Sequence, residues 1–243
     1  MPVPQPPVKK IPLKDNQYYQ GIFTKKHIIL HHTAGGSAAS SIAGWAANPD
    51  HIATPYMIDR NGDIFECFDP KYWAYSLGVK GQTSLEKATI AIEISCYGSL
   101  AVAMKDHVPS PGTLQKFKTG DLITYTGKPI EPAKTVKLLP FRPQVNPFTD
   151  KTKPIVYDGT NKGTSYDGTI FEAYTPEQIA ALKQLLPYLI DKFKIILQAD
   201  RKNFWEYQNP ATLPMGIFSH TTVRKDKIDI FPQKEIVDLV YSL

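Results

Sequence analysis

Cysteine is scarce in this sequence, which has only two among 243 residues, Cys67 and Cys96. Neither lies in a C-x-x-C or C-x-x-H spacing, so the sequence supports neither a disulfide framework nor a cysteine-based metal site. Both fall in segments with strand character. We therefore expect two free, buried thiols.

Long apolar runs are also missing. None approaches the ~18 residues that a membrane-spanning helix needs, so we expect no membrane insertion. The first ten residues, MPVPQPPVKK, lack the apolar core of a secretory signal, which predicts synthesis in the cytoplasm and any export by another route. An apolar content of 42% with 21% charged residues is ordinary for a globular protein, and 243 residues suffice for one domain with a substantial core.

Runs of basic charge are absent although the formal net charge is +5. This charge favours an anionic partner, and both nucleic acid and bacterial wall polymer are candidates. The Lys and Arg residues are dispersed, however, and no helix-turn-helix, zinc-finger or RNA-binding-sheet signature occurs, so we expect no nucleic-acid partner. The alternative is that the charge serves only solubility.

The most informative stretch that is present is the segment 27–36, HIILHHTAGG. Four residues with strand propensity lead into His31 and His32, and two glycines follow. This pattern is typical of a buried strand that brings imidazoles to the edge of a sheet, and strand alternation turns the two histidines to opposite faces. A histidine at a strand end is more often a hydrogen-bonded core residue than a metal ligand, so the pair alone decides little.

Two further segments predict strands. In the segment 54–68, two apolar runs flank Asn61-Gly62, which predicts a hairpin. In the segment 89–95, TIAIEIS, alternation places three isoleucines on one face and Glu93 among small residues on the other. This leaves room for a group beside Glu93, although a surface glutamate on a half-buried strand is the simpler interpretation.

Three segments predict helices. The segment 37–48 suits a short helix that covers the first strand. A capping box at Thr175 begins a longer helix with an apolar face that extends to Phe193, and Pro187 should kink or break it. A final helix is expected over about 233–241.

The chain divides into an arm and one domain. Residues 1–20 are rich in proline and predict an extended surface strap. Residues 21–243 form the predicted domain, and 104–168 form an insertion that lacks periodicity but contains a hairpin near 122–125. We expect the insertion to wall a substrate groove, and the alternative is a packing flap without ligand contact.

The residue types also suggest a metal site. The segment before the last predicted helix offers His220, Lys227 and Asp229 on what we expect to be one short loop. Catalytic zinc takes three protein ligands and leaves a fourth position for water, and His31, His220 and Asp229 meet this requirement. Glu93 is then placed to transfer a proton, and Lys227 to stabilise an oxyanion.

Five segments carry a resemblance to a known family. They are ILHHTAG, YMIDRNG, IAIEI, YTPEQ and the stretch 220–232, in this order. Together they resemble the zinc-dependent N-acetylmuramoyl-L-alanine amidases, which include phage lysozyme-type amidases, anhydromuramyl-peptide amidases and peptidoglycan recognition proteins. The resemblance covers most of 21–243, matches the insertion less securely and excludes the proline-rich arm.

The resemblance implies a fold and a reaction. The fold would be a single α/β domain with a central mixed sheet flanked by helices. The reaction would be hydrolysis of the peptidoglycan amide between N-acetylmuramic acid and L-alanine, with a zinc ion as cofactor. Separately, we expect the protein to be a monomer. Transferred position by position, the resemblance makes His31, His220 and Asp229 the zinc ligands. It makes Glu93 the general base and Lys227 a cationic group beside the third ligand.

Two positions depart from the pattern. Many relatives have a histidine where this chain has Ser76, and some have a tyrosine near the metal where Thr54 aligns. We expect these two residues and Tyr56 to contact substrate. The ligands and Glu93 are retained, so catalysis remains the expectation.

Other interpretations stay open. A peptidoglycan-binding protein of the same fold without activity is one, and a basic nucleic-acid-binding protein is another. An active enzyme could be a phage-type endolysin acting on the cell wall or a cytoplasmic amidase that recycles wall fragments. The basic charge and the insertion favour the polymeric wall.

Overall fold

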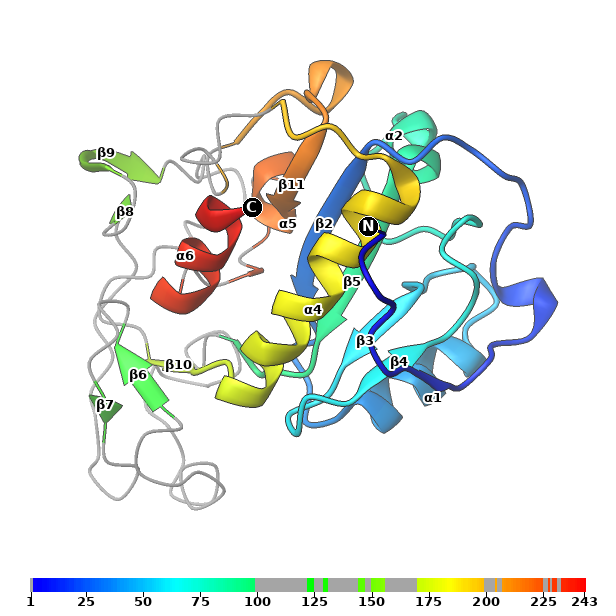
Figure 1. Cartoon of the computed structure of the whole chain (residues 1–243), viewed down its shortest axis with the longest axis horizontal. Helices are drawn as coiled ribbons and strands as arrows, with labels where there is room; N and C mark the ends of the chain where they lie inside the picture. Colours follow the sequence, from blue (N-terminus) through cyan, green and yellow to red (C-terminus); the bar gives the residue numbers. More distant parts are fainter. Residues whose placement is uncertain are drawn as a thin grey trace.

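The computed structural model describes residues 2–98, 170–198, 204, 207–224, 227, 229–230 and 233–243. It also describes the backbone of four short strands between 122 and 155. A six-stranded sheet forms the centre, with the strand order β1-β4-β3-β5-β2-β11 (Figure 1). Helices pack on this sheet, so the predicted single α/β domain is confirmed.

The sheet is mixed, as predicted. Strands β11, β2, β5 and β3 run parallel to one another, whereas β4 is antiparallel to β3. The edge strand β1 pairs in parallel with β4. The strand bounds are β1 Lys9–Lys10, β2 His27–His32, β3 Tyr56–Ile58, β4 Ile64–Glu66, β5 Thr89–Ile94 and β11 Gly216–Ser219.

Helices contribute to both faces of the sheet. The long helix α4 crosses in front of β2 and β5 in Figure 1, with α6 beside it. Short 3-10 helices η1 and η5 lie in connecting segments. The bounds are η1 Asp15–Gln17, α1 Ala38–Ala47, α2 Thr83–Ala88, α4 Pro176–Phe193, η5 Pro210–Thr212, α5 His220–Val223 and α6 Lys234–Ser242. Within the described part of the chain, no helix combines the length and apolar character needed to cross a membrane.

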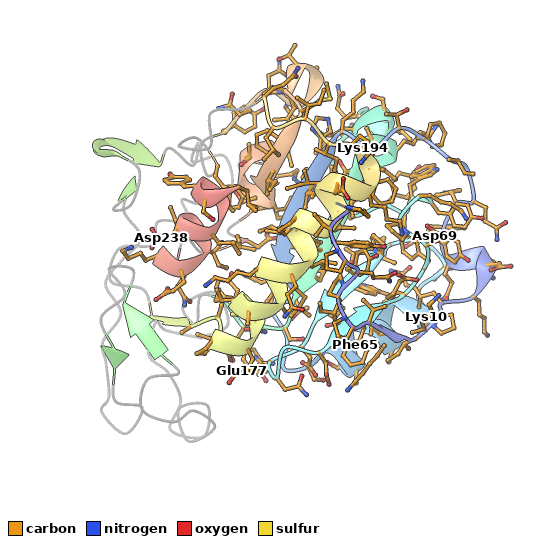
Figure 2. The ribbon with its side chains drawn as sticks, in the orientation of Figure 1. Lys10, Phe65, Asp69, Glu177, Lys194 and Asp238 are labelled. Atoms are coloured by element: carbon orange, nitrogen blue, oxygen red, sulfur yellow. The ribbon has the colours of Figure 1, made fainter. Side chains whose placement is uncertain are left out.

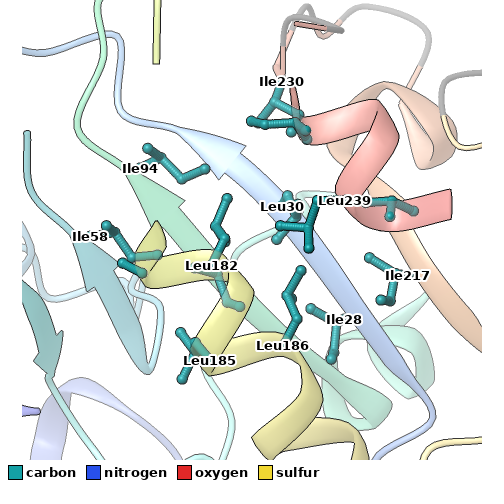
Figure 3. Packing of buried hydrophobic residues seen from close by; sticks show 14 of the residues in the cluster. Ile28, Leu30, Ile58, Ile94, Leu182, Leu185, Leu186, Ile217, Ile230 and Leu239 are labelled. Atoms are coloured by element: carbon teal, nitrogen blue, oxygen red, sulfur yellow. The ribbon is translucent and has the colours of Figure 1, made fainter. Parts of the chain in front are cut away.

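Strand alternation divides the core into two sides. On β2, Ile28 and Leu30 face α4 and pack with leucines of that helix such as Leu186 (Figure 3). Ile29 faces the other way and packs with Phe218. Because side chains alternate along a strand, His31 shares the face of Ile29, and His32 shares the face covered by α4.

Helix α4 has the predicted start but differs at its proline. Thr175 accepts a hydrogen bond from the Gln178 backbone, and the Gln178 side chain accepts one in return from the Thr175 backbone. A kink or a break was predicted at Pro187, and the helix runs through this residue without a break. A proline inside a helix costs about 3 kcal/mol, but a buried leucine stabilises by roughly 1.5–3 kcal/mol. Four leucines of α4 are buried: Leu182, Leu185, Leu186 and Leu189.

Helix α1 has the predicted bounds but a different packing partner. Ser37 caps it by accepting a hydrogen bond from the Ser40 backbone. Its buried Ile42 packs with Met57 of β3 and with Cys67. The helix therefore covers the hairpin of β3 and β4, and the expectation that it covers the first strand is corrected.

The N-terminal arm contains the short strand β1 and the 3-10 helix η1. The backbone N–H of Val3 donates to Asp191 of α4 at 3.0 Å. Further along, the Ile11 and Leu13 backbones donate to the carbonyls of Glu66 and Cys67. The arm thus adds an edge strand to the sheet. Cys67 and Cys96 are free and buried, as predicted.

Most of the predicted insertion at 104–168 lies outside the described residues, and so does the groove that it was expected to wall. The predicted hairpin within it is confirmed, because β6 and β7 pair in antiparallel fashion. A second pair joins β8 and β9, and β10 pairs with β6. The bounds are β6 Leu122–Thr124, β7 Pro129–Ile130, β8 Gln144–Asn146, β9 Asp150–Ile155 and β10 Ile170–Glu172.

The dispersed charge of the sequence is visible on the folded chain. Lys10, Glu177 and Asp238 are exposed and lie at widely separated points around the molecule (Figure 2). The side chains labelled there carry both signs, so they mark no single basic face.

Candidate metal centre and active site

Two parallel strands bring the first two histidines together. His31 is near the end of β2, and His220 follows directly after β11. Ser219 of β11 pairs with Leu30 of β2. The residues that follow them, His220 and His31, are therefore also neighbours. Asp229 is held close to them because its carbonyl accepts a hydrogen bond from the Thr221 backbone at 3.0 Å.

The three side chains form a tight, buried cluster. Asp229 Oδ2 lies 2.9 Å from His220 Nδ1 and 3.2 Å from His31 Nδ1. The two imidazole rings are 4.3 Å apart between centroids. The exposed fractions are only 2% for His31, 5% for His220 and 8% for Asp229. These are the residues that the sequence predicted as zinc ligands, and the structure brings all three together.

The hydrogen bonding of His220 indicates a place for a cation. Its Nε2 atom lies 2.9 Å from the carbonyl oxygen of Leu77. A carbonyl can only accept, so Nε2 carries the proton, and in the neutral ring Nδ1 then presents a lone pair. That lone pair faces an oxygen of Asp229 at 2.9 Å, and two acceptors so close need a proton or a cation between them.

The donor set fits zinc, and so do the two spacings around Asp229. Two imidazoles and one carboxylate are common zinc ligands, and ligands bound tetrahedrally at about 2.0–2.1 Å lie roughly 3.3 Å from one another. The 2.9 and 3.2 Å separations around Asp229 are close to that value. Moreover, the Leu77 carbonyl is the kind of partner that orients a metal-binding histidine.

The cluster also perturbs its own ionisation. Burial lowers the pKa of His31 to about 4, and His220 adds to this shift because its protonated form would repel a second positive charge. Burial alone would raise the pKa of Asp229, but the two histidines beside it hold that pKa well below its usual range. A neutral imidazole beside an ionised carboxylate is the protonation state that metal binding requires.

Glu93 lies next to this cluster. It is the direct register partner of His31 on β5, and it also pairs with Met57 of β3. Its side chain is half-buried, with Oε2 shielded from solvent and without a hydrogen-bond partner among the described residues. Burial and the charge of Asp229 raise the pKa of Glu93 well above its usual value, and Lys227 opposes this shift.

Lys227 is near enough to act on the same groups. Its charge lowers the pKa of both His31 and Glu93, and its backbone N–H donates to the Arg224 carbonyl at 3.3 Å. Lys227 thus lies on the short connection after α5, within electrostatic range of His31 and Glu93.

The three expected substrate contacts do not join the cluster. Tyr56 pairs with Ile92, whose side chain faces α4, so its ring is fully buried on the opposite side of the sheet, with its hydroxyl donating to Glu66. Thr54 is buried and its hydroxyl donates to the Tyr56 carbonyl. Ser76 donates to Glu86, although its neighbour Leu77 contacts His220. The strand register thus places the Tyr56 ring on the face of the sheet opposite His31 and Glu93.

Sequence reasoning missed two features of the site. It placed His220, Lys227 and Asp229 on one short loop, whereas β11 ends directly before His220 and α5 begins at it. The apolar run in Gly216–Ser219 was the signal for this strand. It also overlooked the Leu77 carbonyl and the buried Glu86, for which the sequence gives no signal because a backbone contact leaves no residue pattern.

The comparison with protein families concerns the segment that holds β2 to β5. Residues 23–125 match the family model described as N-acetylmuramoyl-L-alanine amidase. This matched segment contains His31 and Glu93, whereas His220 and Asp229 lie beyond it. The resemblance inferred from the sequence is therefore confirmed for this part of the chain.

Several solved structures are similar to this chain over most or part of its length. The N-acetylmuramoyl-L-alanine amidase LysC from Clostridium intestinale URNW is 12% identical over 97% of this chain and 98% of its own, with a TM-score of 0.42. A selenomethionine AmpD derivative is 14% identical over 96% and 94%, with a TM-score of 0.47. The match to PlyL is 14% identical, covers 37% of this chain and 57% of PlyL, and has a TM-score of 0.33. This chain thus spans just over half of PlyL. No curated protein sequence matches it.

Proposed function

We propose that this protein is a zinc-dependent N-acetylmuramoyl-L-alanine amidase. It hydrolyses the peptidoglycan amide between the lactyl group of N-acetylmuramic acid and L-alanine. The observation that carries the proposal is the convergence of two histidines and Asp229 on one buried point beside Glu93, in a chain whose residues 23–125 match the amidase family model.

His31, His220 and Asp229 would hold the ion. Bound there, zinc supplies a Lewis acid that polarises the scissile carbonyl and makes water a stronger nucleophile. The chain contributes fixed geometry, since the Leu77 carbonyl determines which nitrogen of His220 faces the centre. Asp229 is in turn fixed by its backbone bond to Thr221.

Glu93 moves the proton in the proposed reaction. It accepts a proton from the attacking water as the oxygen–carbon bond forms, and it delivers that proton to the nitrogen as the carbon–nitrogen bond breaks. A carboxylate with a raised pKa is suited to both roles, because its affinity for the proton is nearer to that of its partners at neutral pH. Lys227 stabilises the negative charge that develops on the carbonyl oxygen.

The proposed substrate is the polymeric cell wall, as for a phage-type endolysin. The formal net charge of +5 and sequence pI of about 9.0 support attraction to an anionic polymer. A cytoplasmic enzyme that recycles soluble muropeptides is the second candidate, and the family match of residues 23–125 supports both. A binder without activity is disfavoured because Glu93 lies beside the cluster.

Product analysis tests the proposal. Purified protein incubated with insoluble peptidoglycan should release stem peptides that begin with L-alanine and leave the glycan strands intact, as read by mass spectrometry. New reducing sugar ends would instead indicate a glycosidase. Turnover of soluble muropeptides with no release from insoluble wall would favour the recycling enzyme.

A further inference from the structure

A single peptide unit connects the buried carboxylate of Glu86 to His220. The N–H of Gly78 donates to Glu86 Oε1 at 3.0 Å. The carbonyl of the same peptide, that of Leu77, accepts the hydrogen bond from His220 Nε2 at 2.9 Å. A chain of hydrogen bonds therefore runs from the Glu86 carboxylate through the Leu77–Gly78 peptide to the His220 imidazole, which belongs to the candidate metal cluster.

Glu86 is held rigidly in this arrangement. Its exposed fraction is 2%, and it forms no ion pair within the described ranges. Three successive backbone N–H groups, those of Ser76, Leu77 and Gly78, donate to it at 3.0–3.2 Å. The Ser76 hydroxyl adds a fourth donor. Burial raises the pKa of Glu86, and the backbone donors oppose that shift because they stabilise the ionised form.

The conformation of the loop from Ser76 to Gly78 allows its backbone N–H groups to bind the Glu86 carboxylate. Successive N–H groups that converge on one anion form a nest, which needs a residue in the left-handed region. Gly78 has φ +61, where a side chain would be strained and would also meet Arg224. With the N–H groups turned toward Glu86, the carbonyls of Leu77 and Gly78 face outward, where Arg224 donates to both of them.

Two physical effects follow for His220. A carboxylate at the N–H end of a peptide polarises it, so its carbonyl becomes a stronger acceptor. A strong, fixed acceptor at Nε2 keeps the proton on that nitrogen and leaves the Nδ1 lone pair directed toward Asp229. Outer partners of this kind hold a metal-binding histidine in its tautomer and orientation and raise its basicity.

We propose that Glu86 is a positioning residue for the metal ligand His220 and acts through the Leu77–Gly78 peptide. The inference rests on the proposed zinc site. Glu86→Gln keeps the size of the side chain but replaces an acceptor oxygen with a donor amide, which leaves at least one loop N–H unpaired. Loss of such a partner costs about 10–100-fold in metal affinity, and we expect a weakening of this order.

The test measures Zn²⁺ affinity by competition with a chromophoric chelator for wild type, Glu86→Gln and a matched control. Glu172→Gln is the control, because Glu172 is also a buried carboxylate and accepts hydrogen bonds from Arg60 and the Tyr97 backbone, away from the loop of Leu77 and Gly78. The expected result is weaker zinc binding in Glu86→Gln alone. Equal affinity in Glu86→Gln and wild type, or equal losses in both variants, would overturn the inference. Wild type that binds no zinc would overturn the proposed function instead.

A measurement on wild type applies even if Glu86→Gln does not fold. Nitrogen-15 NMR of the zinc-loaded protein distinguishes the two ring nitrogens of His220. We expect a proton on Nε2 and metal on Nδ1. Metal on Nε2 would show that the Leu77 carbonyl does not orient this ring, and the inference would be wrong.

Discussion

His31 and Glu93 are direct register partners on the neighbouring parallel strands β2 and β5. Partners in register project to the same face of a sheet, so one strand pair supplies both a candidate metal ligand and a candidate proton carrier. Met57 occupies the matching position on β3, which leaves Glu93 beside an apolar neighbour and with an unpartnered Oε2 among the described residues. Because the two roles fall on different residues, replacing one residue of the pair can test metal binding and proton transfer separately.

Replacing Glu93 should abolish chemistry and leave metal binding intact. Glu93→Gln keeps the size of the side chain but removes the base, so turnover should fall by about 10²–10⁴-fold. Zinc content and thermal stability should stay near wild type. The measurement is the release rate of stem peptides together with zinc per chain, and wild-type turnover in a folded, zinc-containing variant would make Glu93 a structural residue.

Replacing His220 should remove the metal itself. In His220→Ala only two of the three ligands remain, so both zinc content and activity should be lost. His32→Gln is the matched control, because His32 is equally buried but faces α4 and hydrogen-bonds to the Tyr174 hydroxyl at 3.0 Å. This variant should retain zinc. Elemental analysis of both proteins gives the answer, and full activity in metal-free wild type would exclude a zinc mechanism.

Removing the Tyr56 hydroxyl should leave substrate affinity unchanged. The ring lies on the face covered by α4, and its hydroxyl donates to Glu66 at 3.2 Å. Tyr56→Phe should therefore lower the free energy of unfolding by about 1 kcal/mol, typical for one hydrogen bond, at constant KM. A large rise in KM without loss of stability would restore Tyr56 as a substrate contact.

Acid should destabilise the fold through His27. Burial, with the nearby charge of Lys26, lowers the pKa of His27 from 6.5 to about 4. Between these two values the unfolded chain binds a proton that the folded chain does not, so stability is present above pH 6.5 and falls as the pH drops toward 4. The expected loss is about 3 kcal/mol in total.

The variant His27→Gln separates the contribution of His27 to acid-induced loss of stability from the contributions of the other histidines. His27→Gln cannot titrate in this range but keeps a donor for the Pro214 carbonyl that the imidazole contacts. In chelator-treated protein, denaturant unfolding at about pH 7 and pH 4.5 should show a smaller loss for His27→Gln than for wild type. An identical loss in both would assign the acid sensitivity to other groups.

Local patterns in the sequence were sufficient to predict individual turns, helix starts and strand faces. Asn61-Gly62 predicted the hairpin, and Gly62 indeed has φ +81 in the turn between β3 and β4. The capping residues at Thr175 gave the start of α4. Alternation along β5 placed Glu93 on the face opposite Ile92, as the core clusters show. Each of these features depends only on residues within a few positions of one another, which is why the sequence contained them.

Contacts between distant segments were decided by the tertiary structure alone. The register of β11 against β2 places His220 beside His31, and the register of β3 against β5 turns Tyr56 away from them. The Leu77 carbonyl that orients His220 comes from a residue 143 positions away. Sequence motifs identified the ligand types because chemistry restricts them to a few residues. The registers and the backbone contact depend on how the sheet and its loops pack, and no local pattern encodes that packing.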